Sequence, residues 1–143
     1  MIMDASLLFS DSQAITATAA STNVVDLGAT GTIYGAGAAI VRDIGPGERA
    51  PLVVTVTETF NTLTSLTISI ETDDNSGFSS ATTVWTSPAY TLAQLAIGAK
   101  YLLPDVIPVG VNERYVRLKY TVGGSNPTLG KITAGVVMDR QTA

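Results

Sequence analysis

Two aspartates and an asparagine stand together at Asp73, Asp74 and Asn75, and a cluster of oxygen ligands suits a calcium ion. The spacing departs from the helix-flanked calcium loop, because Gly77 comes one position early and Val84 occupies the place of the bidentate glutamate. Hydrogen bonds from Asx side chains to nearby backbone amides explain the same residues as a polar turn. The sequence therefore predicts a turn here and no metal site.

Residue types that most catalytic mechanisms need are missing from the chain. It has no histidine and no cysteine, which removes the commonest general base, the commonest zinc ligand and the thiolate nucleophile. No GxSxG or SxxK spacing is present to activate a serine. A glycosidase that uses only carboxylates needs two acids roughly 5–10 Å apart, whereas Asp73 and Asp74 are adjacent and expected to diverge. We predict that the protein is not an enzyme.

The segment GAGAAI at 35–40 has small residues spaced as at the start of a dinucleotide-binding fingerprint. Ile40 replaces the third small residue and no helical pattern follows, so a flexible glycine-rich loop is the better interpretation and no cofactor is expected. The longer loop at 28–51 carries three side chains suited to contact with another protein, which are Tyr34, Arg42 and Arg49.

A second group of candidate interface residues lies near the C-terminus. Tyr115, Arg117 and Lys119 alternate with apolar residues and so share the polar face of an expected strand. Tyrosine and arginine are enriched at protein interfaces. A tyrosine that simply covers the edge of a sheet is the alternative, and the sequence leaves both interpretations open.

Charge and hydropathy indicate a protein partner. Charged residues make up 14% of the chain and hydrophobic residues 45%, whereas about a quarter of the residues in an average domain are charged. Part of the surface is therefore expected to be covered. The net charge of -4 and the pI near 4.5 exclude a basic nucleic-acid footprint.

The charges are also divided unevenly along the chain. Residues 1–99 hold two basic and nine acidic residues, a net charge of -7, while residues 100–143 hold six basic and three acidic residues, a net charge of +3. This asymmetry suits complementary contacts between subunits. A folded sheet that interleaves the two halves would explain it equally well.

No targeting or membrane segment is expected. Asp4 stands where an export signal needs lysine or arginine, and the first apolar run stops at Phe9. No window approaches the ~18 consecutive apolar residues of a membrane helix.

Periodicity predicts an almost entirely β protein. Alternating apolar and polar residues predict strands at 64–72, 114–122 and 131–138, with a hairpin connection at 123–130. Further strands are expected at 52–58 and 83–87, weaker ones at 14–20 and 23–27, a glycine-rich loop at 28–47, and one or two helical turns at 91–97. Seven to nine strands with no linker indicate one sandwich or barrel domain, with an extended arm at about 1–12.

The two ends of the chain resemble the capsid cement, or decoration, proteins of tailed bacteriophages, including one from a Bordetella phage. The resemblance runs through LLFSDSQAITATAASTNVVDLG at 7–28 and TLAQLAIGAKYLLPDVIPVGVNERYVRLKYTVGGSNPTLGKITAGVV at 91–137. Its most specific parts are FSDSQA and DLG in the opening segment and RYVRLKYTV and PTLGKITAG in the closing one.

The resemblance implies a jelly-roll-like antiparallel β-sandwich that binds the outside of a capsid. It further implies a major capsid protein as partner, dimers rather than trimers at or near capsomer junctions, and a virion location after synthesis in the host cytoplasm. Separately from the resemblance, the irregular, small-residue composition of the segment 1–12 and the loop 28–51 makes them the expected shell contacts. The alternative is a carbohydrate-binding or receptor-binding β-sandwich of a virion or cell surface.

Overall fold

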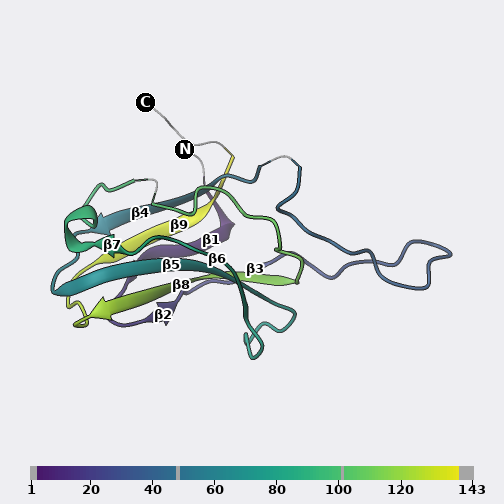
Figure 1. The fold of residues 1–143 in the computed structure, drawn as a ribbon. Helices are drawn as coiled ribbons and strands as arrows, with labels where there is room; N and C mark the ends of the chain where they lie inside the picture. The colour runs from purple at the N-terminus through teal and green to yellow at the C-terminus, as the bar shows by residue number, and fades with distance from the viewer. Residues whose placement is uncertain (1–2, 48, 101, 139–143) are drawn as a thin grey trace.

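Two antiparallel sheets face each other across one hydrophobic core (Figure 1). The computed structural model describes residues 3–47, 49–100 and 102–138. The three-stranded sheet has the order β1 (Met3–Ala14), β9 (Lys131–Val137) and β4 (Leu52–Glu58). The six-stranded sheet has the order β2 (Ala19–Ala20), β8 (Tyr115–Gly124), β5 (Leu63–Asp73) and β6 (Thr82–Thr86), with β3 (Val25–Asp26) on β8 and β7 (Tyr90–Thr91) on β5. The predicted all-β antiparallel sandwich is confirmed.

The core follows from the alternation of apolar and polar residues in β5 and β8. Leu66, Ile68 and Ile70 of β5 are fully buried, as are Leu118 and Tyr120 of β8. These strands pair along their whole length, so their apolar residues form one continuous surface. The three-stranded sheet covers that surface with Phe9, Leu52, Val54, Val56, Ile132 and Ala134.

The connection between β8 and β9 differs from the prediction. A hairpin was expected at 123–130, but β8 pairs with β5 whereas β9 pairs with β1 and β4. Residues 125–130 instead carry the chain from one sheet to the other. Gly130 permits this crossing, because a Cβ atom there would lie 2.3 Å from the Phe60 ring and its φ is +132°. Alternation predicts which face of a strand is buried, but not which sheet the strand joins.

The N-terminal segment is a second correction. An extended arm was expected at about 1–12, but β1 pairs with β9 from Met3 opposite Val137 to Ala14 opposite Lys131. Three register shifts interrupt this ladder and remove the regular alternation by which β1 would have been recognised. Residues 1 and 2 of the expected arm lie outside the described residues.

The remaining elements agree with the predictions apart from their lengths. The strands expected at 52–58, 64–72, 83–87, 114–122 and 131–138 are present within two residues of their expected bounds. Those expected at 14–20 and 23–27 shrink to two residues each, in β2 and β3. The helical segment expected at 91–97 is the single 3-10 turn η1 (Leu92–Gln94), where the Gln94 side chain accepts a hydrogen bond from the Thr91 amide.

A buried polar network joins the two sheets. Ser10 Oγ donates to Gln13 Oε1 at 2.7 Å, so the Tyr120 hydroxyl, 2.8 Å from Ser10 Oγ, is the donor of the second bond. Burial raises the pKa of Tyr120 well above its ordinary value, which keeps that proton in place. Gln13 Nε2 donates in turn to the Ala20 carbonyl at 2.8 Å. The network therefore holds the irregular β1 in place against β8.

We expect Tyr120→Phe to lower the free energy of unfolding by about 1–2 kcal/mol, because it removes a buried hydrogen bond while leaving the ring in place. Tyr115→Phe is the control, since its half-exposed ring lies on the outer face of the sheet, and a change within about 0.5 kcal/mol is expected. Urea denaturation of both variants measures the difference. Equal effects would show that the network contributes nothing specific.

Candidate interaction surfaces

An arm of residues 29–41 projects from one end of the sandwich, at the right in Figure 1, and every one of its residues is exposed. Local contacts order it. Thr32 and Ala39 form an isolated antiparallel bridge, and the Ile40 amide donates to the Gly31 carbonyl at 2.9 Å. The predicted glycine-rich loop is therefore a short, minimally paired hairpin outside the core.

The arm presents apolar side chains to water. Ile33 is 63% exposed, Val41 is 91% exposed and Tyr34, near the tip, is fully exposed. The sequence carries no charged residue between Asp26 and Arg42. An apolar, uncharged projection of this kind is typical of a segment that binds another protein.

Hydrogen bonds fix the root of the arm to the sandwich. Arg42 donates to the carbonyl groups of Leu27 at 2.7 Å and Gly28 at 2.8 Å, which joins the outgoing and returning chains. Arg114 donates two hydrogen bonds to the Asp26 carboxylate, both at 2.8 Å, and the Gly28 amide donates a third. These bonds, those from Arg114 above all, lower the pKa of Asp26 to about 2.

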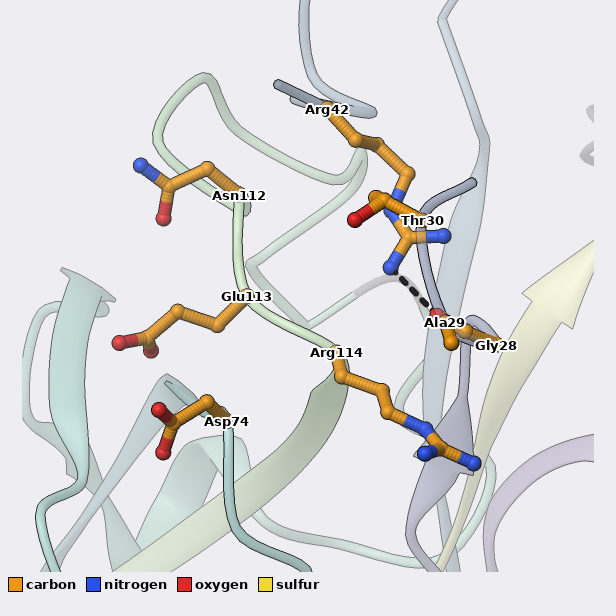
Figure 2. Close-up of a pocket in the computed structure, with 8 residues that line it drawn as sticks. All are labelled: Gly28, Ala29, Thr30, Arg42, Asp74, Asn112, Glu113 and Arg114. Atoms are coloured by element: carbon orange, nitrogen blue, oxygen red, sulfur yellow. Dashed lines mark hydrogen bonds between the residues drawn. The ribbon is translucent and has the colours of Figure 1, made fainter. Parts of the chain in front are cut away.

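A shallow hollow of about 380 Å³ lies beside this root (Figure 2). Figure 2 shows Arg42 reaching to Gly28, while the carboxylates of Asp74 and Glu113 point away from the guanidinium of Arg114. Because both acidic and basic side chains line the hollow, it does not favour either an anionic or a cationic ligand. Its remaining lining residues are Ala29, Thr30 and Asn112.

The second predicted group lies on the outer face of the six-stranded sheet, but its charges are already paired. Arg117 contacts Glu71 at 2.7 Å and Lys119 contacts the same carboxylate at 3.2 Å, while Glu71 is only 3% exposed. The Arg117 guanidinium also lies 4.1 Å from the centre of the Phe78 ring. Tyr115 is half-buried, with the Arg114 guanidinium 4.9 Å from its ring centre. These contacts stabilise the sheet and leave little of the group for a partner.

The Asx turn predicted after β5 is confirmed. Asp73 accepts hydrogen bonds from the amides of Asn75 at 2.9 Å and Ser80 at 2.8 Å, and from the Ser80 hydroxyl at 3.0 Å. The Asn75 side chain accepts from the Gly77 amide at 2.8 Å. These bonds, first of all the one from Asn75, lower the pKa of Asp73 below its ordinary value. The carboxylate that suggested a calcium ligand is thus used by the turn itself.

Pairing inside the chain accounts for the uneven charge distribution. Every ion pair found among residues 3–47, 49–100 and 102–138 joins an acid from the first 99 residues to a base from the rest. The pairs are Asp26–Arg114, Glu71–Arg117, Glu71–Lys119 and Glu58–Lys131. The fold therefore interleaves the two halves, which favours that interpretation over complementary contacts between subunits.

The candidate interface residues thus lie in two separate places. Tyr115, Arg117 and Lys119 are on the outer face of the six-stranded sheet, and the other three are in the loop 28–51. Tyr34 lies near the tip of the arm, Arg42 at its root, and the exposed Arg49 follows it in the same loop. Sequence reasoning missed the exposed aliphatic residues of the arm and the anchor between Asp26 and Arg114. The run without charge between Asp26 and Arg42 was a visible signal for the first. No comparable signal links Asp26 to Arg114, because 87 residues separate them.

We expect the pKa of the Asp26 carboxyl to be about 2 in the intact protein and to rise toward its ordinary value of 3.8 in an Arg114→Gln variant, where the hydrogen bond from the Gly28 amide still lowers it. The lowered pKa means that the ion pair stabilises the fold above about pH 4 and is lost as the pH falls toward 2. Carbon-detected NMR of the carboxyl groups measures both midpoints. Arg117→Gln, which leaves this pair intact, is the control; a wild-type midpoint at 3.8 would contradict the account.

Within the part of the chain that the structure describes, no helix is both long and apolar enough to span a bilayer.

Comparison with known proteins identifies the family. A search of curated proteins gives no match. The family model Bbp16 matches residues 9–136, which include the arm and most of both sheets. Bbp16 is a Bordetella phage protein family, as the resemblance of the two ends of the chain led us to expect. The chain therefore belongs to the Bbp16 family and is a phage structural protein.

Proposed function

We propose that the protein is a capsid cement protein, which binds the outer surface of a tailed-phage shell and stabilises it by bridging neighbouring major capsid subunits. The observation that carries this proposal is the exposed apolar arm. The protein acts mechanically and not as an enzyme, it uses no cofactor, and it assembles on the shell as a homodimer. The family membership supports the phage setting.

Binding through the arm would be driven by the free energy gained when its exposed apolar side chains leave water. Full burial of a valine or isoleucine side chain contributes about 1.5–3 kcal/mol. Ile33 and Val41 are mostly exposed, at 63% and 91%. A partner surface that covers both side chains would therefore gain enough free energy to hold the arm in one place.

The construction of the arm suits this role. Its root is fixed by Arg42 and by the pair of Asp26 with Arg114, so the direction of the arm is set before binding. Its outer part is held by the bridge between Thr32 and Ala39 and by a few backbone hydrogen bonds within the arm, so it can adapt to the surface of the shell. Many identical copies then add their modest contacts over the whole capsid.

Exposed aromatic residues do not favour the alternative carbohydrate-binding function. A sugar platform needs rings that are exposed together on one face. Among the aromatic residues of the described ranges, Tyr34 alone is exposed, while Trp85, Tyr90 and Tyr115 are half-buried and the others are buried. The Tyr90 hydroxyl is also occupied, since it accepts a hydrogen bond from the Leu103 amide.

The direct test mixes the purified protein with capsids that lack it and separates bound from free protein by sedimentation. We expect saturable binding with a fixed number of copies per shell. Binding should persist in high salt, because the arm has no charges to be screened. Absence of binding at every salt concentration would refute the proposed function.

We expect a double variant, Ile33→Ser with Val41→Ser, to bind capsids about 10- to 100-fold more weakly than the wild type, since a loss of 1.4 kcal/mol is a tenfold change. Its melting temperature should change little, because both side chains are already mostly exposed. Thr121→Ala, an exposed position on the outer face of the sheet, is the control. Equal binding of the double variant and the control would remove the arm from the interface.

A further inference from the structure

The end of the sandwich opposite the arm carries a second surface without charge. Three loops form it, 59–62, 92–98 and 125–130, and we call it the end surface. It lies at the left in Figure 1, around η1 and the start of β5, whereas the arm projects at the right. No charged residue occurs in 59–70, 86–99 or 120–130. Two of the flanking charges, Glu58 and Lys131, pair with each other at 2.8 Å, and the exposed Lys100 follows the loop 92–98.

Exposed aliphatic side chains occupy this surface. Ile97 is 66% exposed, Leu129 is 52% exposed and Leu92 is 38% exposed. One comes from the turn η1, one from the loop after it, and one from the crossing between the sheets, so the sequence alone does not bring them together.

Hydrogen bonds make the end surface rigid. The Ile97 amide donates to Thr59 Oγ1 at 2.9 Å. Asn61 accepts from the amides of Thr128 at 2.9 Å and Leu129 at 3.0 Å through one oxygen, and its nitrogen donates to the Thr128 hydroxyl. The loop 59–62 thus ties the two neighbouring loops together, with Phe60 buried beneath it. A surface fixed in this way loses little entropy when a partner covers it.

We propose that the end surface is a second site of attachment to the capsid, and that its partner is an uncharged aliphatic surface on a shell subunit other than the one that receives the arm. This inference rests on the proposed function, because a protein that bridges subunits needs two contacts on opposite sides of its body. The charge-free character sets the chemistry of the partner, since a charged surface would be desolvated here without compensation.

The distance between the end surface and the arm suits a protein that contacts two subunits at once. β5 runs from the end surface at Leu63 to Asp73 beside the arm root. At about 3.3 Å per residue its 11 residues span roughly 35 Å, and the arm adds further reach. Two linked contacts can bind 10²–10⁴-fold more tightly than either contact alone.

The test compares Ile97→Lys and Leu129→Lys with Thr121→Lys, which adds the same charge at an exposed position on the outer face of the sheet. Thermal unfolding first establishes that all three variants are folded. Capsid binding is measured by co-sedimentation, and stabilisation of the shell by its disassembly temperature. We expect the two end-surface variants to bind about 10²-fold more weakly and, even at saturation through the arm, not to raise the disassembly temperature. Thr121→Lys should behave as wild type.

Two results would overturn the inference. In the first, the wild-type protein binds capsids, and both end-surface variants bind and stabilise them as well as it does. The proposed function would then survive, but the end surface would not be a contact. The second is a free wild-type dimer in sedimentation velocity that Ile97→Lys dissociates, which would make a second copy of the chain the partner of this surface. Failure of the wild-type protein to bind capsids refutes the proposed function instead, and is visible in the same experiment.

Discussion

The antiparallel ladder between β5 and β8 is the constraint on which the rest of the molecule depends. It extends from Leu63 opposite Gly124 to Asp73 opposite Tyr115, with one register shift between Leu63 and Ser65. Its inner face supplies about a third of the core residues, and its outer face holds the buried Glu71 between Arg117 and Lys119. One end of the ladder adjoins the end surface and the other adjoins the arm root. A single paired element therefore sets both the stability of the sandwich and the distance between its two candidate contacts.

Polar side chains at the two ends of this ladder hold the adjoining loops in fixed directions. The pair of Asp26 with Arg114 and the double contact of Arg42 direct the arm, while Asn61 ties together the loops of the opposite end. The two ends differ in kind, because beyond its root the arm is held only by short-range backbone contacts of its own, whereas side-chain hydrogen bonds tie the loops of the end surface together. An adaptable contact and a preorganised one together suit a protein that must fit a large, regular lattice.

The sequence predicted the strands whose alternation is regular and failed where that alternation breaks. β5 and β8 were recognisable because each buries one face along its length. β1 was missed because its register shifts disturb the pattern, and the β8–β9 connection was misassigned because a two-residue period says nothing of sheet membership. Contacts between distant residues, such as Tyr120 with Ser10, leave no local signal. The charge-free run of the arm was local and could have been found.

The segments that carried the family resemblance prove to be parts of the scaffold. FSDSQA places Phe9 in the core and Ser10 and Gln13 in the buried network. DLG contains Asp26 and Gly28 of the arm root, and PTLGKITAG contains the crossing at Gly130. Most of these residues build the fold, and only the Thr128–Leu129 part of PTLGKITAG lies exposed on the end surface, so the resemblance identified the architecture and the family but left the contacts to be found from the structure.

A cryo-EM reconstruction of capsids saturated with the protein tests the central claim most directly. The account predicts the sandwich on the outside of the shell, with the arm of residues 29–41 and the end surface resting on two different capsid subunits. Density in which the protein touches a single subunit, or in which the arm and the end surface both face solvent, would contradict it.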